Sequence, residues 1–246
     1  MNIVNWHKHN DMVPLKVGDY VRVRRDLSME KTYDAEVVPN MLCLKGIVTR
    51  ISKVRKDGYE LLGMIRGTRK YGWSKDMLQR ASKEEMAQNK VFLACDMVRI
   101  IPNFKEIALK DDDIDYDDID EMNEYAGKAA YITDINFYEG KIVSYELDID
   151  GGDYWWSPRY LQRITARKWL KENSAVTMAP GTFVKIREDL DVNKRYGSLP
   201  VHHIMAKFIG TKAFIEYIDD DDTYRLTDCN SEGNFWWTPQ MLERVE

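Results

Sequence analysis

The sequence predicts a mainly β protein with three tandem small barrels joined by short helical linkers. The first observation is an aromatic-rich segment that occurs three times in the 246 residues. Aligned on the tryptophan before Ser or Thr, its copies lie 83 and 81 residues apart, and self-similarity at a near-constant interval indicates a repeat protein. The copies are YGWSKDMLQRA (71–81), YWWSPRYLQRI (154–164) and FWWTPQMLERV (235–245).

The second observation is that other motifs fall into the same register. Each unit begins with a segment in which apolar and basic residues alternate with the period of a strand. An M-x4-G motif follows, then an isoleucine five residues beyond the glycine, then Tyr-Glu-Leu or Tyr-Arg-Leu. The strand-like segments are VGDYVRVRRDL (17–27), ACDMVRIIPNF (94–104) and PGTFVKIREDL (180–190).

The end of each unit predicts a strand that stops and turns. Proline cannot donate a ladder hydrogen bond, so W-[S/T]-P ends the fourth strand, and its Ser or Thr can cap one helical turn. Lys75 replaces this proline in the first unit and weakens the stop there. The apolar pairs that follow are expected in the core: Met77–Leu78, Tyr160–Leu161 and Met241–Leu242.

The predicted order in each unit is a strand, a long loop, three further strands, one helical turn and a last strand. This is the order of an SH3-like barrel of about 70 residues, whose thin core depends on aromatic side chains. Both linkers are rich in helix formers and begin with Ser or Thr as possible caps. The predicted organisation is an N-terminal segment (1–14), a first barrel (15–81), a helical linker (82–91), a second barrel (92–164) with an acidic insert (110–121), a helical linker (165–177) and a third barrel (178–246).

The series VGDxVRVRxDL, M-x4-G, YxL and W-[S/T]-P-x-M-L resembles the SH3-like repeat of Mind bomb ubiquitin ligases. It resembles still more the short single-repeat proteins that are common in bacteriophage genomes. The second copy departs most, because Pro102 follows its first strand and an acidic insert lengthens its first loop. The resemblance implies a binding module, since Mind bomb repeats hold peptide tails, and it brings no catalytic motif. It also implies a phage or mobile-element protein that acts in the cytoplasm of the bacterial host.

Composition and charge limit the class of protein and the kinds of partner further. The net charge of −5 divides into +6 for residues 1–85, −7 for 86–170 and −4 for 171–246. No apolar run approaches the roughly 20 residues that span a bilayer, and the first residues lack the apolar core of a signal peptide. Three separated cysteines suit a reducing cytosol. No zinc-type spacing occurs, so we expect neither a metal nor a cofactor.

The outward aromatic residues are the first candidate site. Neighbouring strand residues face opposite sides, so core positions for Trp73, Trp156 and Trp237 place Trp155 and Trp236 outside. We also expect Tyr71, Tyr154 and Phe235 on the outer side. Exposed aromatic residues are typical anchors of protein interfaces. The alternative is that they pack against a neighbouring unit, a linker helix or a second copy of the chain.

The acidic segment KDDDIDYDDIDEMNEY (110–125) is the second candidate. Like-charge runs are usually solvated loops. A functional alternative is that the carboxylates imitate a phosphate backbone and occupy a nucleic-acid channel of another protein. A calcium site is disfavoured, because no glycine follows at the sixth position of the loop. The candidate protein-binding residues here are Asp111, Asp112, Asp113, Asp115, Asp117 and Asp118.

The basic residues of the first unit are the third candidate, because phosphate contacts require such charges. The alternatives are a solvated charged face and pairing with the acidic second unit. We expect one strand face to carry Arg22 and Arg24, and a turn to carry Lys53, Arg55 and Lys56. The candidate nucleic-acid-binding residues are Arg22, Arg24, Arg25, Lys53, Arg55 and Lys56.

Enzymatic function finds no support in the motifs. The sequence lacks GxGxxG, GxxxxGK[ST] and GxSxG. Paired carboxylates occur in acidic runs, where we expect nothing to raise a pKa. We therefore expect a non-catalytic protein-binding protein that inhibits a host complex handling nucleic acid, of the anti-CRISPR or anti-restriction type. Direct nucleic-acid binding and capture of a nucleotide signal between the units are the alternatives, and a homo-oligomer stays open.

Overall fold

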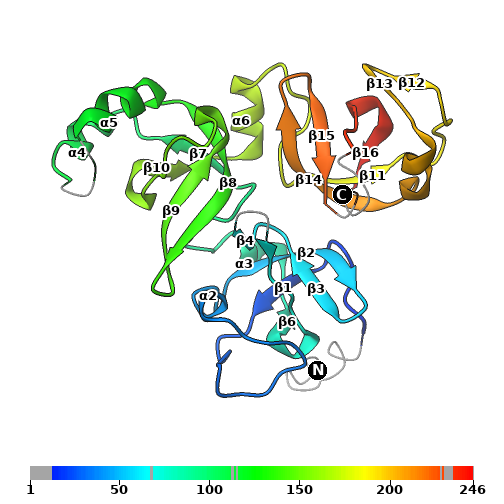
Figure 1. The fold of residues 1–246 in the computed structure, drawn as a ribbon, viewed down its shortest axis with the longest axis horizontal. Coiled ribbons are helices and arrows are strands. Elements are labelled where there is room, and N and C mark those ends of the chain that lie inside the picture. The colour runs from blue at the N-terminus through cyan, green and yellow to red at the C-terminus, as the bar shows by residue number, and fades with distance from the viewer. Residues whose placement is uncertain are drawn as a thin grey trace.

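A computed structural model describes residues 13–66, 69–111, 114, 116–227, 229 and 235–245. The fold is mainly β. Three four-stranded antiparallel sheets repeat one strand order, and two two-stranded ribbons accompany them. The sheets lie around a common centre, with the first sheet below the other two in Figure 1.

The first sheet has the order β3-β2-β1-β6. Its strands are β1 (Tyr20–Val23), β2 (Val48–Arg55), β3 (Gly58–Leu61) and β6 (Leu78–Arg80). The loops of this unit carry α2 (Pro39–Leu42), the ribbon of β4 (Ile65–Arg66) and β5 (Arg69–Lys70), and the 3₁₀ turn η1 (Lys75–Met77).

The second sheet has the matching order β9-β8-β7-β10. Its strands are β7 (Met97–Ile100), β8 (Ala129–Tyr138), β9 (Lys141–Leu147) and β10 (Leu161–Arg163). Its connections contain α4 (Phe104–Ala108), α5 (Tyr116–Met122) and the 3₁₀ turns η2 (Asn123–Tyr125), η3 (Asp148–Asp150) and η4 (Pro158–Tyr160). The acidic insert, expected as a loop, is therefore partly helical in α5.

The third sheet has the order β15-β14-β11-β16. Its strands are β11 (Phe183–Ile186), β14 (Lys212–Asp219), β15 (Thr223–Leu226) and β16 (Leu242–Arg244). The same unit holds the ribbon of β12 (Arg195–Tyr196) and β13 (Leu199–Pro200), with the 3₁₀ segments η5 (His203–Phe208) and η6 (Pro239–Met241). Between the sheets lie α3 (Lys83–Met86) and α6 (Ala166–Glu172).

A register shift curls each sheet. The long second strand pairs with the first strand on one side and with the third strand on the other. Its pairing with the third strand shifts directly after the repeated isoleucine, at Ile51, Ile132 and Ile215. A bulge at this point bends the strand and increases its twist, which rolls the sheet toward a half-barrel.

The repeated motifs have the same structural role in every unit. Trp73, Trp156 and Trp237 are 0% exposed, and each forms a single β-bridge to the tyrosine of YxL. The predicted fourth strand is thus reduced to this bridge. The glycines of M-x4-G have φ of 78° to 80°, a left-handed conformation that favours glycine. Each donates its N–H to the carbonyl of the last residue of the first strand in its unit: Gly46 to Val23, Gly127 to Ile100 and Gly210 to Ile186.

The ends of the units fold as 3₁₀ turns, and the apolar pair after each motif is buried as predicted. The predicted capping by Ser74, Ser157 and Thr238 is wrong, because none of these side chains caps its turn. Thr238 instead donates its hydroxyl to the Tyr196 carbonyl at 2.8 Å. In the linker helices, Ser82 and Thr165 do act as N-caps.

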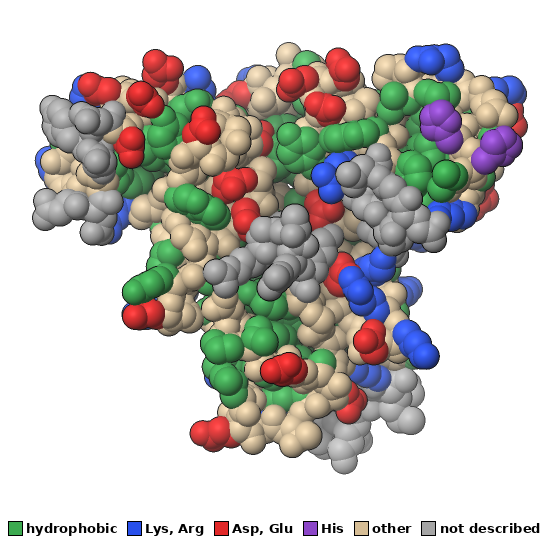
Figure 2. Space-filling view, in the orientation of Figure 1, with side chains coloured by type: hydrophobic (Ala, Val, Ile, Leu, Met, Phe, Trp, Pro, Cys, Tyr) green, Lys and Arg blue, Asp and Glu red, His purple; other side chains and the backbone are tan. Residues whose placement is uncertain are grey.

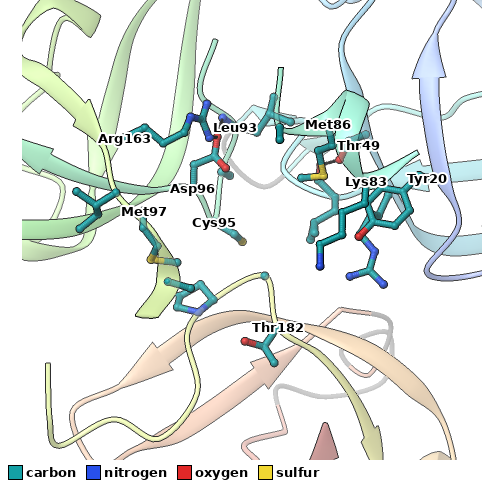
Figure 3. Close-up of a pocket in the computed structure, with 18 residues that line it drawn as sticks. Tyr20, Thr49, Lys83, Met86, Leu93, Cys95, Asp96, Met97, Arg163 and Thr182 are labelled. Carbon is teal, nitrogen blue, oxygen red and sulfur yellow. Dashed lines mark hydrogen bonds and ion pairs between the residues drawn. The ribbon is translucent and has the colours of Figure 1, made fainter. Parts of the chain in front are cut away.

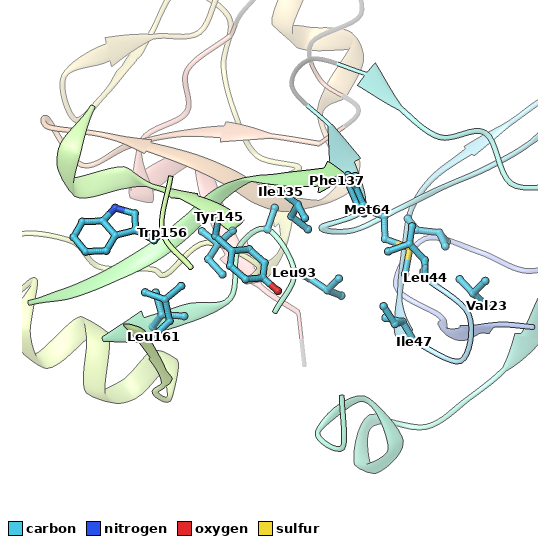
Figure 4. Packing of buried hydrophobic residues seen from close by; sticks show 14 of the residues in the cluster. Val23, Leu44, Ile47, Met64, Leu93, Ile135, Phe137, Tyr145, Trp156 and Leu161 are labelled. Carbon is cyan, nitrogen blue, oxygen red and sulfur yellow. The ribbon is translucent and has the colours of Figure 1, made fainter. Parts of the chain in front are cut away.

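The first two sheets share one hydrophobic core, whereas the third has its own. The long β8–β9 hairpin of the second unit makes the connection, because Phe137 near its tip packs edge-to-face on Tyr71 at 6.5 Å. Figure 4 shows Phe137 beside Met64, with Leu93 between the two sheets. The repeated units therefore differ in how they pack against one another.

Candidate functional site

The outward tryptophan differs among the three units. Trp155 is 45% exposed, as the alternation of strand residues predicts. Trp236 is half-buried, and its ring packs edge-to-face on Tyr217 at 5.9 Å. Gly72 stands at this position in the first unit, where a Cβ atom would meet nothing within 4 Å. The second unit alone among the three thus presents a largely exposed tryptophan here.

The prediction that Tyr71, Tyr154 and Phe235 face outward is wrong. All three are half-buried and pack against the hydrophobic cores. They lie two residues before the buried tryptophans, so the period of a strand places them on the same side as those tryptophans. Tyr154 packs edge-to-face on Trp156 at 6.3 Å, and Phe235 packs on Phe208 at 5.8 Å.

Helix α5, which contains part of the acidic insert, has one buried face and one exposed face. Ile119 and Met122 are buried in the shared core and anchor the helix. Asp118, Asp120 and Glu121 are exposed, in keeping with an amphipathic helix. Figure 2 shows acidic side chains gathered over this end of the second unit.

The candidate aspartates of the insert do not act as one group. The Asp111 side chain is only 8% exposed, accepts a hydrogen bond from Arg159 Nη1 at 2.8 Å and accepts another from the Tyr160 hydroxyl. Its role is therefore to hold η4 in place. Asp118 is exposed. Asp112, Asp113, Asp115 and the side chain of Asp117 lie outside the described residues.

A hydrogen bond joins the acidic helix to the segment that carries Trp155. The Tyr154 hydroxyl donates to Glu121 Oε2 at 2.7 Å, and this bond raises the pKa of Tyr154 to about 12. Burial raises the pKa of the neighbouring Tyr125, with contributions from Asp150, Asp153, Glu124 and Glu121. We name the surface formed by Tyr154, Trp155, Asp118, Glu121 and Glu124 the acidic–aromatic surface.

The basic residues of the first unit are largely paired within that unit and its linker. Arg22 pairs with Glu85, Arg24 with Asp26 at 3.0 Å, and Arg55 with Glu60. None of these three ion pairs reaches the acidic second unit.

The other basic candidates show a further difference from the prediction. Lys53 and Arg55 lie on β2 rather than in a turn, and only Lys56 occupies the turn. Arg25 and Lys56 are exposed. A continuous nucleic-acid-binding surface would therefore have to compete with these internal ion pairs.

Two carboxylates in η3, the half-buried Asp148 and the buried Asp150, were not predicted. The Asp150 side chain accepts a hydrogen bond from Trp156 Nε1 at 2.5 Å, and the Asp148 side chain accepts one from the Tyr131 N–H at 2.7 Å. Burial raises the pKa of Asp148 to about 7, and it also raises the pKa of Asp150. These two carboxylates lie outside the acidic runs considered in the sequence, and their pKa is raised because the turn after β9 folds back onto the core.

Neither a metal-binding cluster nor a membrane-spanning helix is found in the described part of the chain. Across the described residues, no group of three or more His, Cys, Asp or Glu side chains is arranged to hold a metal ion. No helix within the described part of the chain has the length and apolar character needed to cross a membrane.

No protein-family model matches the chain, and no curated protein matches it at a significant level. The resemblance to the Mind bomb repeat therefore rests on the motifs of the sequence alone.

Proposed function

We propose that this chain is a non-catalytic protein-binding protein built from three SH3-like barrels, and that the acidic–aromatic surface is its binding site. One observation carries the proposal. Trp155 is 45% exposed, and the residue before it, Tyr154, is hydrogen-bonded to the acidic helix α5. Exposed tryptophans in fixed surroundings are frequent binding hot spots, whereas isolated mobile side chains are not.

The chemistry of this surface supports a basic protein partner. Asp118 and Glu124 are exposed, and no described residue forms an ion pair with either of them. A basic protein surface with an apolar pocket would match these charges and the indole of Trp155. Protein channels that hold nucleic acid are lined with such basic residues, because they neutralise phosphates. The proposed partner is therefore a nucleic-acid-handling protein of the bacterial host, of the CRISPR or restriction type.

Site-specific photo-crosslinking tests the proposal inside a bacterial host. Trp155 is replaced by p-benzoylphenylalanine, and Trp236 is replaced in a second variant as the matched control. We expect position 155 to capture a basic nucleic-acid-handling protein that position 236 does not capture. Equal capture from both positions, or none from position 155, would contradict the proposed site.

A quantitative test then uses the captured partner. Trp155→Ala should weaken binding at least about tenfold, as for an interface hot spot. Asp118→Asn combined with Glu124→Gln should slow association and reduce its salt dependence. Asp111 stays unchanged, since it holds Arg159 and Tyr160. Wild-type affinity in both variants would exclude the acidic–aromatic surface as the contact.

A further inference from the structure

A cavity of about 380 Å³ lies where the three sheets meet. Figure 3 shows Cys95 near its middle, Lys83 and Tyr20 on one side and Thr182 below. Strand residues of the first two sheets, the turn before β11 of the third and residues of helices α3 and α6 contribute to its lining. Its volume is in the range of about 300 to 1,000 Å³ that is usual for small-molecule sites.

Equivalent turns of the three units shape this cavity. Gly18, Cys95 and Gly181 precede the first strand of each sheet, have φ of 94°, 70° and 76°, and donate their N–H to the repeated isoleucines at 2.8 to 2.9 Å. A Cβ atom on Gly18 would lie 2.8 Å from the Phe183 ring, and one on Gly181 would lie 3.5 Å from Cys95 Cβ. Close packing at these turns therefore brings the three units together around the cavity.

Arg50 lies in the cavity wall, and its positively charged guanidinium is only partly engaged by protein groups. Its guanidinium lies 5.0, 4.7 and 4.5 Å from the ring centres of Tyr20, Phe183 and Phe214, and its Nε donates to the Gly18 carbonyl at 3.1 Å. Burial lowers the pKa of Arg50. Among the described residues no carboxylate pairs with it, so the Nη donors are available to a ligand.

The charge of the lining favours an anion. Lys83 is exposed on α3 and forms no ion pair with any described residue. Arg163 pairs with Asp96 at 2.7 Å, and among the described residues that line the cavity Asp96 is the one carboxylate. Arg163 and Asp96 neutralise each other. The positive charges of Arg50 and Lys83 therefore have no negatively charged partner among the described residues of the lining.

The remaining wall is apolar and is formed by Leu62, Met86, Leu93, Ala94, Met97 and Pro180. The hydroxyls of Thr49 and Thr182 are already committed to the carbonyls of Leu62 and Ala179, at 2.7 and 2.6 Å. Few neutral polar groups are therefore left to recognise a sugar or an amide. We propose that the cavity binds a small organic anion, with its phosphate or carboxylate against Arg50 and Lys83 and an apolar or planar group against the apolar wall.

Calorimetric titration with four probes tests this site in the whole protein. Phenyl phosphate, adenosine monophosphate and benzoate carry an anionic group, whereas benzyl alcohol does not. We expect saturable binding of at least one anion and none of benzyl alcohol, and the phosphate and carboxylate probes separate the two kinds of anion. Absence of binding by all three anions, or equal binding of benzyl alcohol, would overturn the proposal.

Two further measurements locate the bound anion. Lys83→Met should weaken binding about tenfold or more, whereas Lys45→Met, an exposed lysine outside the cavity, should leave it unchanged. Bound ligand should slow alkylation of Cys95 by iodoacetamide but not alkylation of Cys43, which is outside the cavity. Equal effects on both lysine variants, or unprotected Cys95 at saturation, would place the ligand elsewhere. These outcomes do not depend on the acidic–aromatic surface.

Discussion

Trp156 donates a hydrogen bond from its indole Nε1 to Asp150 Oδ2 at 2.5 Å, inside the core of the second unit. The equivalent indoles of Trp73 and Trp237 are equally buried, yet their Nε1 atoms have no hydrogen-bond partner among the described residues. The second unit therefore satisfies a buried donor that the other two leave unpaired, and it does so with a carboxylate that burial makes costly.

The first prediction concerns this pair. Asp150→Ala should destabilise the protein by about 1–3 kcal/mol, because it leaves the Trp156 indole without an acceptor. Asp150→Asn, which retains a carbonyl oxygen at the same place, should cost less. Urea unfolding followed by tryptophan fluorescence measures both. An alanine variant as stable as the wild type would show that the bond contributes nothing net.

The second prediction is a pH dependence due to Asp148. Its folded pKa of about 7 exceeds the ordinary 3.8, so between these values the folded state binds more protons than the unfolded state. Its contribution therefore destabilises the fold increasingly as pH rises from about 4 to 7.

Asp148→Asn tests this dependence. Relative to the wild type, the variant should gain stability as pH rises, by up to about 1.4 kcal/mol per pH unit. Unfolding free energies at several pH values, compared between the two proteins, give this difference directly. A difference independent of pH would contradict the raised pKa.

The third prediction concerns the contact between the first two units. Phe137 is 5% exposed and packs on Tyr71, so Phe137→Ala should cost about 3–5 kcal/mol. Its neighbour Tyr138 is 65% exposed, and Tyr138→Ala should change stability by no more than about 0.5 kcal/mol. Similar losses in both variants would mean that the hairpin does not hold the units together. Urea unfolding curves make the comparison.

The fourth prediction separates the tryptophan from the acidic helix. Gly72→Trp places an outward tryptophan on the first unit, where a Cβ atom has free space. The counterpart of α5 in the first unit is the short helix α2, which carries no acidic residue, so we expect normal folding and no second binding site for the partner. Binding stoichiometry by calorimetry decides it, and a doubled stoichiometry would show that the tryptophan alone suffices.

The fifth prediction concerns nucleic acid. Internal ion pairs occupy Arg22, Arg24 and Arg55, so we expect only weak DNA binding that is lost between roughly 50 and 200 mM salt. Arg25→Ala with Lys56→Ala should weaken it, whereas Lys171→Ala on α6 should not. Gel shifts over a salt series measure this. Tight binding that resists salt would instead favour direct nucleic-acid recognition.

The sequence predicted the positions that local geometry controls. The buried tryptophans, the apolar pairs after them and the helices between the sheets all follow from periodicity and helix propensity. Tyr154 and Phe235 were misplaced, although the same alternation puts them beside the buried tryptophans. The capping prediction failed for another reason. The Thr238 hydroxyl donates a hydrogen bond to the Tyr196 carbonyl, elsewhere in the unit, instead of capping its own turn.

By itself the sequence determined which residues each unit buries, because a period of two and a glycine with positive φ act within a few residues of the chain. Only the tertiary structure decided how the units meet. Arg50 reaches the rings of Phe183 and Phe214, and Cys95 faces Gly181, through contacts between residues far apart in sequence. No local pattern encodes such contacts, because they depend on the relative placement of whole sheets. The cavity at the centre and the difference in exposure between Trp155 and Trp236 arise at this level.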